Sequence, residues 1–249
     1  MNIHLKENDP SKSFFGLKVK ENKKDVIKQV SLVEGDGVDS VKGAVQHTPN
    51  KSTERSILYV TGQSGSGKSY YTKDYATVYQ KMYPKNEVYL ISAVQDVSTI
   101  DKIKKLKKID IFKPAFMEIE TIPLEEFKDS LVIFDDIDSL SSKVLKKKVW
   151  NIMSDILTMG RHYNISAIVT FHVATSGMET KLILNESQSI TIFPSASGGR
   201  TLKYLLDSYL GLNKQQIEEI KKLDSRWATI TKTFPRVVLY EKGAYILRN

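Results

Sequence analysis

The chain has 249 residues, of which 41% are hydrophobic and 27% charged, the composition of a globular protein long enough to bury the core of one α/β domain. No apolar run approaches the roughly 18 residues of a membrane span, the amino terminus lacks the apolar core of a signal peptide, and the chain contains no cysteine. These features argue against membrane insertion and give no sign of an oxidising compartment, and they predict an intracellular protein.

The balance of charge indicates an acidic partner. The formal net charge is +8, and nucleic acid is the commonest partner of so basic a protein. Only six of the 37 basic residues are arginine. Because lysine is a point charge whereas arginine presents a planar fork of donors, this inventory favours sequence-independent contacts with phosphates over the reading of bases.

The first 52 residues have the character of an appendage. They are polar, and glycine, proline and asparagine interrupt the approach to the first core strand, as in a linker or a long loop. Only 14–19 and 26–33 have the composition of ordered structure. We expect a partly ordered N-terminal extension over 1–52, able to add a strand to the edge of a sheet, followed by one domain over 53–249.

A phosphate-binding loop begins this domain. Residues 62–69 match the pattern G-x-x-x-x-G-K-[ST] at every specified position. The apolar stretch 57–60 predicts a buried strand before the loop, and 69–82, which lacks glycine and proline, predicts a helix after it. A chance turn rich in glycine and serine would not explain this context. A loop so placed aims backbone N–H groups and a helix N-terminus at one point, which suits a phosphate chain. The predicted nucleotide-binding residues are Gly62, Gln63, Ser64, Gly65, Ser66, Gly67, Lys68, Ser69 and Tyr70.

The rest of the chain alternates strands with helices, the order typical of a mainly parallel sheet covered by helices. Predicted strands lie at 87–92, 131–136, 165–171 and 189–193, and predicted helices at 101–110, 142–159, 181–186, 202–210 and 214–223. In 101–110, apolar residues recur every third position among lysines, which predicts an amphipathic helix with a basic face. Segments 227–231 and 236–240 predict a closing hairpin, and 244–247 a last short strand.

Two acids end the strand 131–136, whose apolar run suits a central parallel strand covered on both faces. The carboxyl end of such a strand is where α/β sheets bind ligands. Asp135 is expected to hold Mg²⁺ through water, with the Ser69 hydroxyl as a second metal contact, and Asp136 to polarise the attacking water. The alternative is a capping pair that begins the next helix, which the phosphate loop upstream disfavours. We expect the loop and the acids to share one pocket where two neighbouring strands end.

The motifs together resemble one family. The phosphate loop, the strand ending in Phe134-Asp135-Asp136, the Gly160-Arg161-His162 step and the segment 185–193 are similar to the FtsK/HerA-like genome-packaging ATPases of large double-stranded DNA viruses and virophages. The resemblance covers about 52–195, and the combination is far more specific than the loop alone. It implies a RecA-like core, ATP hydrolysis, a hexameric or pentameric ring, and translocation of double-stranded DNA into a preformed capsid.

The sequence departs from the family pattern at two positions. His172 ends the strand 165–171 where the family usually has Gln, and Ile183 stands where it usually has Arg, with Lys181 close by. An imidazole can donate to a phosphate oxygen much as an amide does, so His172 is a candidate nucleotide sensor, and a hydrogen-bonded strand-end histidine is the alternative. For a transition-state arginine supplied by a neighbouring subunit, Arg161 is the first candidate and Arg200 the second; a surface ion pair is the alternative for both.

These observations define the hypothesis. The expected fold is α/β: a RecA-like P-loop NTPase core, its mainly parallel central sheet flanked by helices, with an N-terminal extension and a C-terminal β-hairpin. The expected activity is ATP hydrolysis with Mg²⁺, coupled to sequence-independent movement along double-stranded DNA. The proposed catalytic residues are Lys68, Asp135, Asp136, Arg161 and His172. The resemblance further implies contact with capsid vertex proteins and a location in the host cytoplasm, a viral factory or the virion.

Three other classes of protein remain alternatives. A helicase or a conjugation-type ATPase would share the phosphate loop, and strand separation would distinguish it. A small-molecule kinase fits less well because the paired aspartates suit the activation of water. A nucleotide-dependent scaffold would bind ATP without useful turnover.

Overall fold

The computed structural model describes residues 54–196, 199–233 and 236–247, and before them the backbone of three strands alone. These strands, β1 (Asn2–His4), β2 (Phe15–Glu21) and β3 (Lys24–Val30), form an antiparallel sheet of their own in the order β1-β2-β3. We expected the extension to be able to add a strand to the edge of a sheet. Its strands instead form a separate sheet and do not pair with the central one. The remaining residues of 1–53 lie outside the described part of the chain, and the proposed boundary at 52 stays a proposal.

A central sheet of nine strands organises the described part of the domain, in the order β12-β11-β10-β9-β4-β8-β7-β5-β6. The strands from β9 to β6 are parallel, and β10, β11 and β12 continue the sheet in antiparallel pairing. The bounds are β4 (Ile57–Thr61), β5 (Glu87–Ser92), β6 (Leu106–Lys108), β7 (Ser130–Asp135), β8 (Ile165–Phe171), β9 (Ser189–Ile192), β10 (Ala228–Thr231), β11 (Val237–Tyr240) and β12 (Gly243–Ile246). The expected α/β class, with a parallel core and a C-terminal hairpin, is confirmed.

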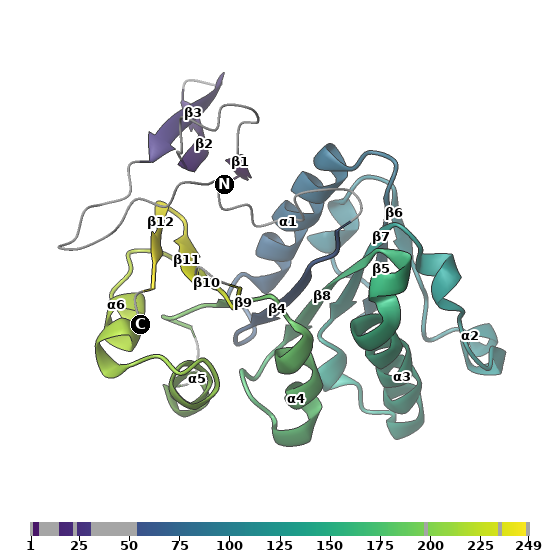
Figure 1. Ribbon diagram of the computed structural model, residues 1–249. Helices are drawn as coiled ribbons and strands as arrows, with labels where there is room; N and C mark the ends of the chain where they lie inside the picture. Colours follow the sequence, from purple (N-terminus) through teal and green to yellow (C-terminus); the bar gives the residue numbers. More distant parts are fainter. Residues whose placement is uncertain are drawn as a thin grey trace.

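Helices cover both faces of this sheet, with α1 on one side and α3 and α4 on the other (Figure 1). The helices of the described residues are α1 (Lys68–Met82), α2 (Pro114–Glu118), α3 (Lys143–Met159), α4 (Gly177–Glu186), α5 (Gly199–Tyr204), continued by a π-helical turn at Leu205–Tyr209, and α6 (Lys214–Lys221). Apart from 101–110, each predicted helix and strand of the domain matches one of these elements to within a few residues.

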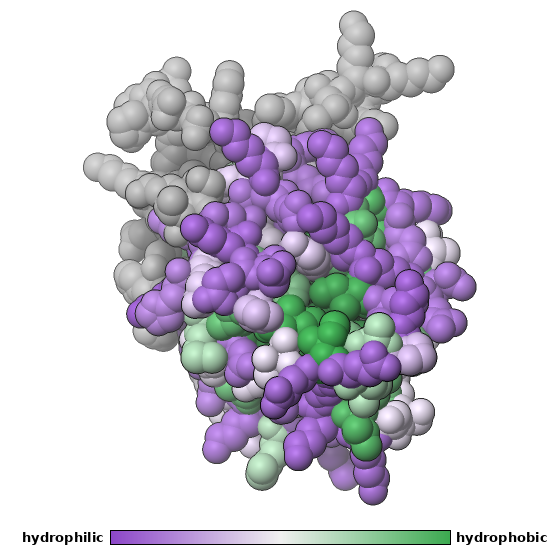
Figure 2. Space-filling model, turned by 90° about the vertical axis from the view of Figure 1, so that its right-hand side faces the viewer, coloured by the Kyte–Doolittle hydropathy of each residue, from purple (hydrophilic) through white to green (hydrophobic). Residues whose placement is uncertain are grey.

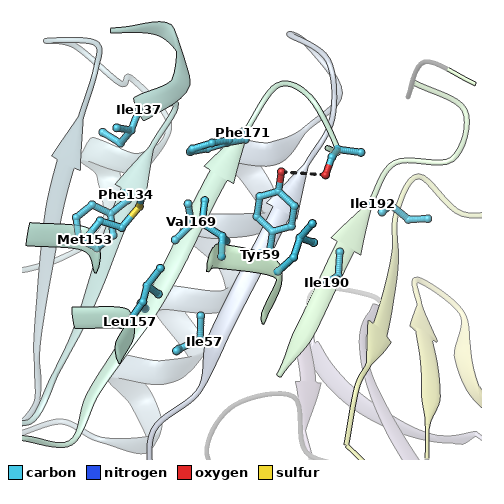
Figure 3. Close-up of a cluster of buried hydrophobic side chains, with 14 of the residues drawn as sticks. Ile57, Tyr59, Phe134, Ile137, Met153, Leu157, Val169, Phe171, Ile190 and Ile192 are labelled. Atoms are coloured by element: carbon cyan, nitrogen blue, oxygen red, sulfur yellow. Dashed lines mark hydrogen bonds between the residues drawn. The ribbon is translucent and has the colours of Figure 1, made fainter. Parts of the chain in front are cut away.

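The two faces explain why the central strands are apolar throughout. In β4, Ile57 and Tyr59 pack with α3, whereas Leu58 and Val60 pack with α1. Figure 3 shows the side chains on the α3 face of the sheet, where Ile57 lies beside Leu157 of α3. Since successive side chains of a strand point to opposite faces, a strand covered on both faces needs apolar residues at every position. This burial fixes where each strand ends and thus where the polar residues that follow it emerge.

The predicted helix at 101–110 is wrong. The segment contains a single 3-10 turn, Ile100–Lys102, and then edge strand β6, which pairs in parallel with β5. Lys105 has a positive φ of 54°, which ends any helix there. Leu106 packs with the α1 side of the sheet and Ile109 with the other side. Residues three apart in an extended chain point to opposite faces, so the three-residue spacing of Leu106 and Ile109 belongs to an extended edge segment and not to one face of a helix.

The β6 edge of the sheet carries exposed apolar side chains. Phe112, Met117 and Ile119, in and around α2, are each more than 40% exposed. Figure 2 shows the side of the molecule on which β6 and α2 lie, where apolar residues gather within a hydrophilic surround. An apolar surface of this kind beside an open sheet edge is typical of a contact surface.

Candidate nucleotide-binding site

The phosphate loop joins β4 to α1 and takes its shape from its glycines. Gly65 and Gly67 have φ angles of 78° and 110°, which favour glycine. A Cβ atom on Gly62 would lie 2.7 Å from Ser66 Oγ and 2.9 Å from the ring of Phe193. The loop therefore has no room for a side chain at Gly62. The three glycines allow it to fold over the N-terminus of α1, whose free N–H groups face the loop.

Lys68 begins α1, and its side chain is buried beneath the loop. Its Nζ donates a 2.9 Å hydrogen bond to the carbonyl oxygen of Gly62 and lies 3.5 Å from Oδ1 of Asp136. Ser69, the next residue, is half-buried. The hydroxyl of Ser66 is buried and has no hydrogen-bond partner among the described residues. Because a buried hydroxyl without a partner is costly, Ser66 is well suited to donate to a phosphate oxygen.

Asp135 is the last residue of β7 and is almost completely buried. It accepts hydrogen bonds from Ser92 Oγ at 3.2 Å and Thr170 Oγ1 at 2.9 Å. Burial, and next the neighbouring charge of Asp136, raise the pKa of Asp135 to about 6, while Thr170, Ser92 and Lys68 act in the opposite direction. A buried carboxylate with too little positive charge around it is a suitable ligand for a cation. The donor set, a carboxylate and hydroxyls, is the one that Mg²⁺ prefers.

Asp136 follows β7 in a left-handed conformation, with φ 51° and ψ 35°. Its N–H faces the carbonyl oxygen and the hydroxyl of Thr170, at 3.1 and 2.9 Å. Its carboxylate lies between two groups: Oδ1 is near Lys68, and Oδ2 is 3.4 Å from Nε2 of His172. The other ring nitrogen of His172 is 3.3 Å from Oδ1 of Asp138. Asp136 is thus held in one orientation at the carboxyl edge of the sheet.

The expectation that two neighbouring strands form the pocket is wrong, because β8 lies between β4 and β7. The order of strands along the chain does not dictate their order in the sheet. β8 comes later in the chain than β4 and β7, yet it lies between them in the sheet. The consequence is chemical: Thr170 and His172, at the end of β8, are placed between the loop and the acids. Lys68 nevertheless reaches Asp136 across this strand.

Arg161 is not brought to this site within the chain. It lies in the 3-10 turn Gly160–Tyr163, before the start of β8, whereas His172 follows the end of the same strand. The 7 residues of β8, at about 3.3 Å each, separate the two ends by roughly 20 Å. Arg161 is exposed, as is Arg200 at the start of α5. A role for either arginine at the phosphates of another subunit stays a prediction.

Several residues of the site were not predicted from the sequence. Ser92 and Thr170 contact the two central acids, Asp138 contacts His172, and Phe193 packs against the loop glycines. Ser92 and Thr170 each lie at the carboxyl end of a predicted strand, and this position was the available signal. Asp138 offered a weaker one, since it lies two residues after the acids on the 3-10 turn Ile137–Ser139.

No family model matches the chain. The Sputnik virophage protein "Uncharacterized protein V3" is 40% identical over 196 residues, which is 78% of each chain. Among solved structures, B204, the DNA-packaging ATPase of Sulfolobus turreted icosahedral virus, has a TM-score of 0.54 at 16% identity and covers 79% of this chain and 98% of its own. The cytoplasmic domain of the Type VII secretion ATPase EccC of Thermomonospora curvata has a TM-score of 0.50 at 12% identity, over 76% of this chain and 25% of its own.

Among the described residues, no helix is both long and apolar enough to cross a membrane. The likeness to B204 confirms, at the level of the fold, the resemblance to viral genome-packaging ATPases that the motifs indicated. The chain therefore belongs to the family of the virophage protein V3 and has the P-loop ATPase fold of the viral genome-packaging ATPases.

Proposed function

We propose that the protein is an ATP-driven motor that moves along double-stranded DNA and packages a viral genome into a preformed capsid. The observation that carries the proposal is the approach of the loop lysine to the second acid, 3.5 Å between Lys68 Nζ and Asp136 Oδ1. The lysine that would offset the charge of the phosphates and the acid that would orient the attacking water then lie in one site. Hydrolysis of a nucleoside triphosphate requires both.

We assign a residue of the site to each requirement of ATP hydrolysis. The loop N–H groups and Lys68 would bind the β and γ phosphates and offset the charge that develops on them. Asp135 and Ser69 would hold Mg²⁺, which when bound supplies positive charge at the phosphate oxygens. Asp136 would orient the attacking water. His172, whose Nε2 lies 3.4 Å from Oδ2 of Asp136, would act at the terminal phosphate from beside that carboxylate.

Movement along DNA is supported by the charge of the protein. Lys143 and Lys147 are exposed on α3, in a chain with a net charge of +8. Lysines of this kind would contact phosphates without reading the sequence.

We further propose that subunits form a hexameric or pentameric ring, with the apolar surface around α2 as one contact between copies and Arg161 acting on the phosphates of the next subunit. Capsid vertex proteins are the proposed docking partner, in the infected cell.

The test compares DNA-stimulated ATP hydrolysis by the parent protein with that of Asp136→Asn. We expect stimulation in the parent and a loss of at least about 10²-fold in the variant, because a positioned base contributes that much or more. Asp155→Asn, the same change at an exposed position of α3, is the matched control and should behave as the parent.

The result separates the alternatives. A slow rate that neither DNA nor Asp136→Asn alters would show a nucleotide-binding scaffold. If hydrolysis is DNA-dependent, displacement of a third strand from intact duplex supports translocation, whereas separation of the two strands of the duplex would show a helicase instead.

A further inference from the structure

Asp138 and His172 form a hydrogen-bonded pair beside Asp136. The carboxylate of Asp138 contacts His172 twice: Oδ2 accepts from the backbone N–H at 2.9 Å, and Oδ1 lies 3.3 Å from ring Nδ1. The ring then presents Nε2 to Oδ2 of Asp136 at 3.4 Å. We propose that Asp138 is a positioning residue, which fixes the His172 ring so that its Nε2 holds the carboxylate of Asp136 in the orientation needed for hydrolysis. This inference rests on the proposed function.

The backbone around this pair is held from several sides, so the orientation of the ring is defined. Ile137, between the two acids, is fully buried, which fixes the turn that carries Asp136 and Asp138. The turn is closed by Ser139, whose N–H and hydroxyl both donate to the carbonyl oxygen of Asp136, at 3.0 and 2.8 Å. Lys146 of α3 donates to the carbonyl oxygen of Asp138 at 3.3 Å. The turn therefore behaves as a rigid support for its two carboxylates.

The segment after His172 is fixed from the opposite side by Tyr59. Its ring is buried in β4, and its hydroxyl lies 2.9 Å from the carbonyl oxygen of Val173 and 3.3 Å from that of Ala174. Figure 3 shows the Tyr59 hydroxyl reaching this segment from the middle of the core. With the backbone held by Tyr59 and by Asp138, the remaining freedom of His172 is rotation of its side chain, and the Nδ1 contact with Asp138 restricts it.

The charges around Asp136 show why a second contact matters. Lys68 is near Oδ1, and the Thr170 hydroxyl lies 3.2 Å from the same atom. Among the described residues, His172 is the group that contacts Oδ2. Without it, the carboxylate could rotate about its Cβ–Cγ bond while keeping the contact with Lys68. A displacement of a reacting group by about 1 Å can cost two orders of magnitude in rate, so a modest loss of orientation would be measurable.

The same three side chains offer one ligand atom each within 4.8 Å of one another, so a metal ion is the competing explanation. The hydrogen-bond arrangement is favoured because one oxygen of Asp138 already accepts the backbone N–H of His172 and the other faces its ring. Both oxygens are thus in use by His172. The two explanations differ in their dependence on Mg²⁺.

The test is a double-mutant cycle on ATP hydrolysis with Asp138→Asn and His172→Gln. Asparagine at 138 keeps an oxygen for the backbone N–H, and glutamine at 172 keeps an N–H donor for Asp136 but has no Nδ1. We expect Asp138→Asn to lower kcat roughly tenfold in the parent, with KM for ATP within about twofold, and to change kcat by less than about twofold in the His172→Gln protein. Asp155→Asn is again the matched control.

A second readout does not depend on turnover. The imidazole ¹H–¹⁵N NMR signals of His172, identified among the four histidines by their loss in His172→Gln, should shift in Asp138→Asn and not in Asp155→Asn. Equal losses of kcat in both backgrounds, unchanged ring signals, or a raised Mg²⁺ requirement at normal kcat would each overturn the positioning role. A parent protein that hydrolyses no ATP overturns the proposed function itself, and a shift of the ring signals would then show the contact without its catalytic purpose.

Discussion

The two ends of β8 differ in how their polar residues are used. At the amino end, polar groups have structural partners: Arg55 donates to the carbonyl oxygens of Ile156 and Leu157 at 3.0 and 2.8 Å, and Asn164 donates to Asp129 at 2.9 Å. These bonds end α3 and close the turn before the strand. Gly160 lies in a tightly packed place there, since a Cβ atom on it would lie 3.2 Å from Arg55 Nη1 and 3.3 Å from the Cβ atom of Ile165.

At the carboxyl end, acids gather instead. Asp135 is buried with Asp136 beside it, and its pKa is raised, which means that its charged form is disfavoured by its surroundings. A fold selected for stability alone would not place two carboxylates there. The comparison teaches that the amino end of the strand supports the fold, while the carboxyl end gives up stability at the site that we propose for phosphate and metal. Mutations of the structural residues at the amino end should therefore lower stability and leave kcat unchanged, whereas mutations of the acids at the carboxyl end should lower activity without a loss of stability.

The largest effect should come from Lys68→Ala. Removing the buried ammonium takes away the phosphate contact and the charge facing Asp136, so we expect ATP hydrolysis to fall by at least about 10²-fold. Lys81→Ala, an exposed lysine in the last turn of the same helix, is the control and should leave the rate within about twofold. Steady-state hydrolysis is the measurement, and an active Lys68→Ala protein would place the nucleotide elsewhere.

Arg161→Ala should show that the amino end also acts, but only on a neighbour. We expect a loss of roughly 10²-fold or more in the assembled protein, because an arginine supplied in trans contributes at least this much. Mixing Arg161→Ala with Lys68→Ala should restore part of the activity, since an intact site then meets an intact arginine at mixed interfaces. Lack of recovery in the mixture, together with an inactive Arg200→Ala protein that recovers, would transfer the role to Arg200.

Asp135→Asn should trade activity for stability. The pKa of Asp135 is raised from 3.8 to about 6 in the folded protein, so the folded state binds more protons than the unfolded state between these values, and stability falls as pH rises through this window. Above it the full difference, about 3 kcal/mol, is a destabilisation that asparagine removes.

We therefore expect Asp135→Asn to be more stable than the parent at pH 7.5, by on the order of 2 kcal/mol, with little difference near pH 4. Urea unfolding in EDTA measures this, and Asp155→Asn should show no such pH dependence. A variant less stable than the parent at pH 7.5 would show that the carboxylate stabilises the fold.

The smallest effect belongs to Arg55→Ala. Its two hydrogen bonds to the last turn of α3 are charge-assisted, and their loss should reduce the free energy of unfolding by about 2 kcal/mol. The exposed Arg226→Ala should cost much less. Because Arg55 lies at the amino end of the sheet, kcat per folded protein should stay within about twofold, and a tenfold loss would contradict the separation between the two ends.

The sequence predicted the parts of the site that depend on local patterns. The loop at 62–69 and the acids at the end of β7 follow from a short motif and from an apolar run that ends abruptly, and both lie where expected. The contact between Lys68 and Asp136 agrees with the shared pocket that they suggested. Burial on both faces makes such strands easy to recognise, because each residue of the run must be apolar.

What could not be predicted depends on partners distant in the chain. The segment 101–110 forms β6 because β5 offers it a free edge, and periodicity alone does not contain that information. The insertion of β8 between β4 and β7 is likewise a property of the whole sheet. Thr170 and Asp138 became site residues only through this insertion, since neither lies in a motif.

The central claim is that one site for phosphate and metal lies at the carboxyl edge of the sheet, made by the loop, Asp135 and Asp136. The most direct measurement is a crystal structure with Mg²⁺ and a non-hydrolysable ATP analogue. The account predicts that Lys68 Nζ contacts the terminal phosphates, that the metal lies between Ser69 and Asp135, and that Asp136 faces a water in line with the γ-phosphate. Nucleotide bound away from the loop, or a metal that contacts neither Ser69 nor Asp135, would contradict it.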